Sequence, residues 1–197
     1  MIPRAKQSSL SVVLIDAQPA FWEAMCGDPE PVLSRLEQLL IACEWFDLPL
    51  LATFEEPTEV KGWLPQRLER VFPHQGHRMV KRTFDLIQEP TIARGLAQMG
   101  RPQLALAGAE TDVCVLQSAL GLLEAGYTVF LLEDCVFTSE PDPRTALRRA
   151  YQAGAVPCTY KTLHYELLAT VDPLAWQEKH REAVSRGFRD PESLPPI

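Results

Sequence analysis

Short apolar runs alternate along the chain with segments whose apolar residues recur at helical spacing. Residues 10–15 (LSVVLI) form the first apolar run and predict a buried strand that ends just before Asp16. In residues 32–43 apolar residues recur every three or four positions, which predicts a helix that packs by one face. The chain therefore begins with a strand followed by a helix.

The same unit repeats through the rest of the chain. Further strands are expected at residues 49–54, 77–83, 103–109, 127–134 and 155–160. Further helices are expected at residues 89–99, after residue 109 as far as Gly126, at 145–153, and in two stretches that reach about residue 187. Strands that are apolar on both faces and alternate with helices predict an α/β fold with a doubly wound, mostly parallel sheet covered on both faces.

The domain organisation follows from this pattern and from the chain length. One domain is expected over residues 1–190, because this length supports a single substantial core. Residues 55–62, which contain Pro, Glu and Gly, are expected to form a loop between the second and third strands. Residues 191–197 are Pro-rich and are expected to form a surface tail.

Composition narrows the classes of partner. The net charge is −7 and no basic stripe is present, which argues against nucleic acid and anionic membrane surfaces as partners. No apolar run approaches the roughly 18 residues of a membrane span, and the first ten residues lack the apolar stretch of a signal peptide. We therefore expect a cytoplasmic protein that acts on a small molecule.

Three reactive residues fall near predicted carboxyl ends of strands, where open parallel sheets bind ligands. Asp16 follows the first strand, Lys81 lies near the end of the third, and Cys114 lies in the first turn of the helix after residues 103–109. The ordinary alternatives are a turn or cap residue for Asp16, a solvated strand end for Lys81 and a buried helix residue for Cys114. Their common position favours a shared site.

The chemistry of these side chains suits nucleophilic catalysis. The first turn of a helix lowers the pKa of a thiol, so this position predicts that Cys114 is activated and alkylates faster than the other four cysteines. Asp16 can take the thiol proton, and the Lys81 ammonium can offset the charge and hold the carboxylate. The unpaired N–H groups of the turn can stabilise an oxyanion. If Thr111 is the N-cap, however, its hydroxyl occupies the amide of Cys114.

Other kinds of site have little support. The five cysteines form no CxxC pair, and their odd number argues against a disulfide framework. His74 and His77 lack a carboxylate at metal-ligand spacing, and His164 and His180 are isolated, so no metal site is expected. Dinucleotide-binding and P-loop motifs are missing as well, so no cofactor is expected, and the absence of a GxSxG motif argues against a serine hydrolase.

The segments LIDAQPAF, MVKRTF and GAETDVCVLQSALGLLEAGYTVFLLEDCV resemble the isochorismatase-like cysteine hydrolases, and the similarity runs from about residue 10 to residue 170. The stretches ETDVCVLQSALGLLEAGYTV and ALRRAYQAGAVPCTYKTLHYELL are most similar to the isochorismatase-domain-containing subgroup. The resemblance implies a six-stranded, Rossmann-like three-layer sandwich with a catalytic triad of Asp16, Lys81 and Cys114. It also implies oxyanion donors at the backbone amides of Glu110 and Cys114. Amidase members form a thioester at this cysteine, and relatives often have a cis peptide at the position of Ala109 and Glu110.

Comparison with the family also bears on the substrate. Metal-binding nicotinamidases have an aspartate and histidines after the second strand, whereas this chain has no histidine there before His74, which argues against that metal site. Members that cleave isochorismate lack the nucleophile, so Cys114 argues against isochorismate. Relatives often have a serine-containing run at the position of residues 82–84 (RTF), where this chain departs from the family. The residues expected to line the substrate pocket are Gln18, Phe21, Trp22 and Phe84.

Two functions remain open. The first is a hydrolase that cleaves an amide, ureide or related C–N bond of a small molecule through a thioester on Cys114. The second is a catalytically silent family member that serves as an oligomeric binding or scaffold protein. The intact triad favours the first. A thiol redox function ranks last, because the nearest other cysteine, Cys135, belongs to a different loop. A homo-oligomer is expected, because many relatives self-associate.

Overall fold

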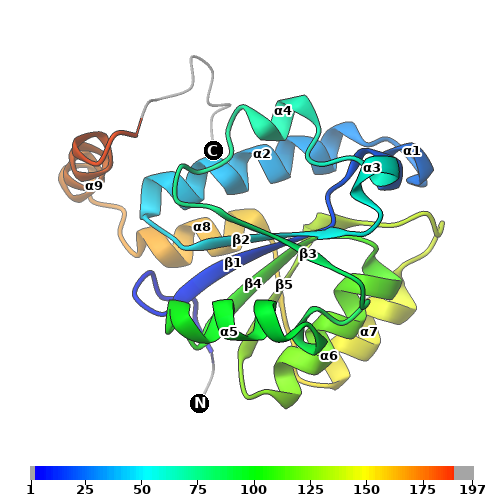
Figure 1. Cartoon of the computed structure of the whole chain (residues 1–197). Helices are drawn as coiled ribbons and strands as arrows, with labels where there is room; N and C mark the ends of the chain where they lie inside the picture. The colour runs from blue at the N-terminus through cyan, green and yellow to red at the C-terminus, as the bar shows by residue number, and fades with distance from the viewer. Residues whose placement is uncertain (1–2, 189–197) are drawn as a thin grey trace.

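Six parallel strands form one sheet in the structure of the chain, a computed structural model that describes residues 3–188 (Figure 1). The strands are β1 (Leu10–Ile15), β2 (Leu50–Glu55), β3 (His77–Lys81), β4 (Gln103–Ala109), β5 (Thr128–Phe137) and β6 (Val156–Cys158). Their order across the sheet is β3-β2-β1-β4-β5-β6. The predicted doubly wound parallel sheet is confirmed. The predicted tail at 191–197 lies outside the described residues.

Helices cover both faces of this sheet (Figure 1). They are α1 (Pro19–Ala24), α2 (Glu30–Phe46), α3 (Thr58–Lys61), α4 (Gln66–Glu69), α5 (Pro90–Met99), α6 (Leu116–Glu124), α7 (Arg144–Gln152), α8 (Tyr160–Leu168) and α9 (Pro173–Ser185). Because strand side chains alternate between faces, Val12 and Leu14 join the core beneath α2 and α8, whereas Val13 and Ile15 join the core beneath α5, α6 and α7. The short helix α3 falls within residues 55–62, which were predicted to be a loop.

The strand order reverses between β1 and β4, and a glycine permits the close approach of these strands. Gly108 has φ +110°, and a Cβ atom there would lie 1.9 Å from the carbonyl oxygen of Ile15. Only glycine fits such a contact with backbone. As a result, the carboxyl end of β4 runs directly beside the carboxyl end of β1, where Asp16 follows.

The C-terminal helix α9 packs beside α2 at the margin of the molecule (Figure 1). Ala183 is the buried residue of this helix, whereas Leu174, Trp176 and Val184 have exposed side chains. Within residues 3–188, no helix combines the length and the apolar character needed to cross a bilayer.

Candidate active site

Four neighbouring strands each place one reactive side chain at or just beyond their carboxyl ends. Lys81 closes β3, Glu55 closes β2 and Asp16 follows β1. Cys114 lies just beyond β4, in a π-helical turn (Thr111–Val115) that leads into α6. Because β3, β2, β1 and β4 are consecutive in the sheet, these residues converge although they are far apart in the sequence.

Asp16, Lys81 and Cys114, the three residues predicted from the sequence, are brought together and buried. The Lys81 Nζ lies 2.7 Å from Asp16 Oδ2 and 3.5 Å from Cys114 Sγ. The Thr53 hydroxyl donates to the other carboxylate oxygen of Asp16 at 2.9 Å, and the Lys81 ammonium also donates to the Thr83 carbonyl at 3.0 Å. The Thr53 hydroxyl thus helps to orient the Asp16 carboxylate, and the Thr83 carbonyl helps to orient the Lys81 ammonium. The catalytic roles of the three residues stay predictions.

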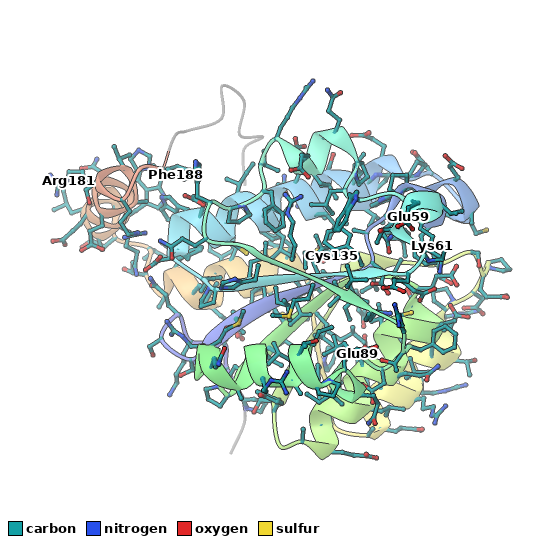
Figure 2. The ribbon with its side chains drawn as sticks, viewed as in Figure 1. Glu59, Lys61, Glu89, Cys135, Arg181 and Phe188 are labelled. Atoms are coloured by element: carbon teal, nitrogen blue, oxygen red, sulfur yellow. The ribbon has the colours of Figure 1, made fainter. Side chains whose placement is uncertain are left out.

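Glu55 is a fourth member of the site that was missed in the sequence. The Cys114 thiol donates to Glu55 Oε2 at 3.2 Å, and Lys81 Nζ lies 3.4 Å from the same oxygen. The other oxygen of Glu55 pairs with Lys61. Figure 2 labels Lys61, which belongs to the short helix α3. The second strand was predicted to end at residue 54, which placed Glu55 in a loop. Its spacing of two from Thr53 is a signal that could have found it, because such residues share one face of a strand.

Gln18, predicted to line the pocket, instead holds the backbone of Glu55. Its side-chain oxygen accepts from the Glu55 N–H at 2.7 Å, while its amide nitrogen donates to the carbonyls of Glu55 at 3.2 Å and of Gly62 at 2.8 Å. The side chain is fully buried. Gln18 therefore positions Glu55, and its amide group is already occupied by backbone.

The three aromatic residues predicted to line the pocket have different surroundings. Trp22 stacks on Phe137 with ring centroids 3.8 Å apart, so it contributes to core packing. The Phe21 ring centroid lies 5.6 Å from Lys61 Nζ, which places Phe21 beside the Glu55 ion pair. Phe84 has an exposed side chain. Of the three, Phe21 is the one in contact with the cation next to the site.

Burial and charge act in opposite directions on the Asp16–Lys81 pair. Burial raises the pKa of Asp16 above its usual value, although the Lys81 charge and the hydrogen bonds from Lys81, Thr53 and Cys114 oppose this. Burial acts to lower the pKa of Lys81, but the negative charges around it outweigh burial, and its pKa is raised. Lys81 is therefore held as the ammonium.

The Cys114 thiol does not have the lowered pKa that its helical position predicted. Burial, and then the charge of Asp16, raise the pKa of Cys114 well above its usual value, and the contact with Glu55 adds to the effect. The opposing influence of Lys81 is smaller. Desolvation and the nearby carboxylates outweigh the effect of the helix terminus, so Cys114 is held as the thiol and its proton must leave as the sulfur reacts.

Alkylation should reflect this raised pKa. We expect iodoacetamide at neutral pH to modify Cys26, which is exposed, before Cys114, which is buried. Labelling of Cys114 should increase as the pH rises, because the thiolate fraction of a thiol with a raised pKa is small at neutral pH. Peptide mass spectrometry of timed samples measures both rates. Faster labelling of Cys114 than of Cys26 at neutral pH would show a preformed thiolate and contradict this expectation.

The turn before Cys114 has the cis peptide that the resemblance implies, between Ala109 and Glu110. The helical turn begins after Glu110, whose carbonyl accepts from the Val113 N–H at 3.1 Å and the Val115 N–H at 3.0 Å. Thr111 is therefore not the N-cap. Its hydroxyl is buried without a hydrogen-bond partner among residues 3–188, so it does not occupy the Cys114 amide.

Donor atoms of Asp16, Glu55 and Cys114 lie within 4.8 Å of one another, which is close enough to share a metal ion. The Lys81 nitrogen, however, lies within 3.5 Å of one such atom from each of the three residues. An ammonium in this position already supplies the cation that the two carboxylates need. These atoms are therefore better arranged to pair with the Lys81 ammonium than to coordinate a metal ion.

A groove of about 730 Å³ lies at the other end of the strands, beside the amino ends of β2 and β3. Pro49, His77, Met79 and Met99 are among its lining residues. His77 begins β3, whereas Lys81 ends it, so the groove and the reactive cluster are separated by the length of the strand. None of the four clustered side chains is among the lining residues of the groove.

The parallel sheet and the acid–ammonium–thiol cluster at its switch point define a class of three-layer α/β proteins with a buried cysteine. Sequence comparison identifies the class further, because the isochorismatase domain profile matches residues 11–162. The chain belongs to the isochorismatase domain family.

Relatives agree with this assignment. Isochorismatase domain-containing protein 2A of Mus musculus is 31% identical over 170 residues, which cover 84% of this chain and 78% of that protein. The octameric hydrolase YcaC of Escherichia coli, of unknown specificity, has a TM-score of 0.82 at 23% identity, covering 94% of this chain and 97% of that one. YcaC of Pseudomonas aeruginosa, solved with hexane-2,5-diol and covalent acrylamide, has the same TM-score and identity, covering 94% and 96%. These structures share the fold of this chain.

Proposed function

We propose that this protein is a cysteine-dependent hydrolase that cleaves an amide, ureide or related C–N bond of a small molecule. The observation that carries the proposal is the contact of the Cys114 sulfur with both a carboxylate and an ammonium, 3.2 Å from Glu55 Oε2 and 3.5 Å from Lys81 Nζ. A thiol placed between a proton acceptor and a fixed positive charge has what covalent catalysis requires.

The proposed reaction proceeds in two halves. The sulfur attacks the carbonyl carbon, and the backbone amides of Glu110 and Cys114 donate hydrogen bonds to the oxyanion. Each donor stabilises the transition state by about 3 kcal/mol. The C–N bond then breaks, the amine leaves with a proton, and the acyl group stays on sulfur as a thioester. Water attacks the thioester, releases the acid and restores the thiol.

A small substrate suits the burial of the site. Cys114 is 2% exposed, and the chain carries a net charge of −7, so a polyanion such as RNA would meet both steric and electrostatic opposition. A homo-oligomer also belongs to the proposal, supported by the octameric YcaC and by the exposed apolar residues of α9. A monomer mass by light scattering would remove it.

The test is capture of the acyl-enzyme. The full chain is incubated with a panel of small primary amides and ureides, quenched in acid and measured by intact mass spectrometry. We expect a subset of the panel to leave an acyl adduct on the peptide that contains Cys114 and to release ammonia or an amine. If no compound gave an adduct or a released amine, the silent scaffold function would gain support.

A further inference from the structure

We infer that Glu55 is a catalytic residue of this site, the carboxylate that accepts the Cys114 proton and later activates the water that hydrolyses the acyl-enzyme. The inference rests on the proposed function and deepens it. The expected triad assigns the proton to Asp16. The geometry points to Glu55, which meets the thiol directly.

The hydrogen bond of the thiol identifies the acceptor. Cys114 Sγ donates to Glu55 Oε2 at 3.2 Å, within the distance usual for a thiol donor. Asp16 has one oxygen bonded to the Thr53 hydroxyl at 2.9 Å and the other in an ion pair 2.7 Å from Lys81 Nζ, although it also interacts with the Cys114 thiol. Asp16 is therefore suited to holding the ammonium in place, and Glu55 to receiving the proton.

Exposure gives the same division of roles. The Asp16 side chain is completely buried, so a proton placed on it has no direct route to water or to a leaving group. The Glu55 side chain is 14% exposed, and its second oxygen pairs with Lys61, whose side chain is 24% exposed. Glu55 thus connects the buried sulfur with the solvent side of the site.

The charge balance supports a proton acceptor at Glu55. Two carboxylates, Asp16 and Glu55, face two ammonium groups, Lys81 and Lys61, so the cluster is neutral while Cys114 is a thiol. Burial acts to raise the pKa of Glu55, but the hydrogen bonds and charges of Lys61, Cys114 and Lys81 outweigh it, and the pKa is lowered. Glu55 is therefore ionised and ready to take a proton. When the proton moves from Cys114 to Glu55, the cluster stays neutral.

Each proton has a defined donor and acceptor in this scheme. The S–H proton moves to Glu55 as the S–C bond forms, and the carbonyl electron pair moves to oxygen. The departing amine takes this proton as the C–N bond breaks. Water then gives a proton to Glu55 as it attacks the thioester, and the sulfur leaves as thiolate. The thiolate recovers the proton from Glu55, and the site returns to its starting state.

Surrounding structure fixes Glu55 in position. Gln18 bonds both its backbone N–H and its carbonyl, and Lys61 bonds its side chain. The neighbouring Glu56 has the same charge but pairs with Arg82, Nε to Oε2 at 2.6 Å, and has no contact with the sulfur among residues 3–188. Glu56→Gln is therefore a matched control for Glu55→Gln.

The experiment uses p-nitrophenyl acetate as the probe, because its phenolate leaves without needing a proton. Burst kinetics and intact mass spectrometry separate acetylation of Cys114 from deacetylation. In Glu55→Gln we expect acetylation and deacetylation both to slow about 100-fold, because Gln can accept neither the thiol proton nor the proton of the attacking water. Glu55→Asp should recover part of the rate, and Glu56→Gln should behave as wild type. Wild-type rates of acetylation and deacetylation in Glu55→Gln, with both rates lowered in Asp16→Asn instead, would show that Asp16 is the proton acceptor.

A second variant covers the case in which Glu55→Gln does not fold. Lys61→Gln removes the cation that lowers the pKa of Glu55, so the acidic limb of the deacetylation rate should shift to higher pH. An unshifted limb would overturn the role of Glu55. If wild type formed no acetyl adduct on Cys114 at all, the proposed function would fail and this inference with it. Normal acetylation of Cys114 with no effect of Glu55 would remove the inference alone.

Discussion

Replacing Cys114 by Ala is expected to reduce hydrolysis of any amide or ureide identified as a substrate by about 10⁴-fold or more, because the covalent route is lost. The same change should abolish the acyl adduct. Turnover of each identified substrate and intact mass spectrometry of wild type and variant give the two readouts. Cys114→Ser should lose nearly as much activity, since a buried hydroxyl is harder to deprotonate than a thiol.

Cys26→Ala is the matched control for Cys114→Ala. Cys26 is exposed and lies outside the cluster, so its loss should leave turnover unchanged. Circular dichroism of the three variants checks that the fold persists. If Cys114→Ala retained a substantial fraction of wild-type turnover, the covalent mechanism would be wrong, and a direct attack by water would have to replace it.

Lys81→Met is expected to lower the free energy of unfolding by about 3–5 kcal/mol, because it removes the cation from a fully buried ion pair. A loss of this size corresponds to a fall in melting temperature of about 10 °C for a domain of this length. Lys161→Met, an exposed lysine of α8, is the control and should change stability by less than about 0.5 kcal/mol. Chemical denaturation and thermal melts measure both variants.

The loss in Lys81→Met should grow as the pH rises. Without the ammonium, burial raises the pKa of Asp16 further, so the folded state holds a proton that the unfolded state releases above the usual pKa of Asp. Stability therefore falls as the pH rises from that value through the raised pKa of the folded state. Asp16→Asn combined with Lys81→Met should recover part of the loss, because it removes the unpaired carboxylate. A pH-independent loss with no recovery would show that the ion pair is not its cause.

The sequence allowed most of the fold and three of the four clustered side chains to be predicted, because both depend on local patterns. Apolar runs located β1 and β4 to the residue, and strand ends identified Asp16, Lys81 and Cys114. Glu55 could not be found in the same way. It is one of two adjacent glutamates, and its spacing from Thr53 favours it only once residue 55 is known to continue β2, whose register against β3 pairs Glu55 with Lys81.

The protonation state of the Cys114 thiol also could not be predicted from the sequence. The position of Cys114 in the first turn of a helix correctly suggested an electropositive backbone, but the sign of its pKa shift depends on burial and on how many carboxylates come near. Both arise from the strand order β3-β2-β1-β4, which is a property of the whole sheet. Local pattern predicts which residues are reactive, whereas long-range packing decides their protonation.

The groove at the amino ends of β2 and β3 affects how ligands of this protein should be sought. A fragment screen read out by melting temperature detects binding anywhere on the fold, including the groove, whose lining residues do not include Cys114. Hits chosen by thermal shift would therefore include ligands that bind away from Cys114. Screens that detect modification or protection of Cys114 itself select for the site where chemistry is proposed.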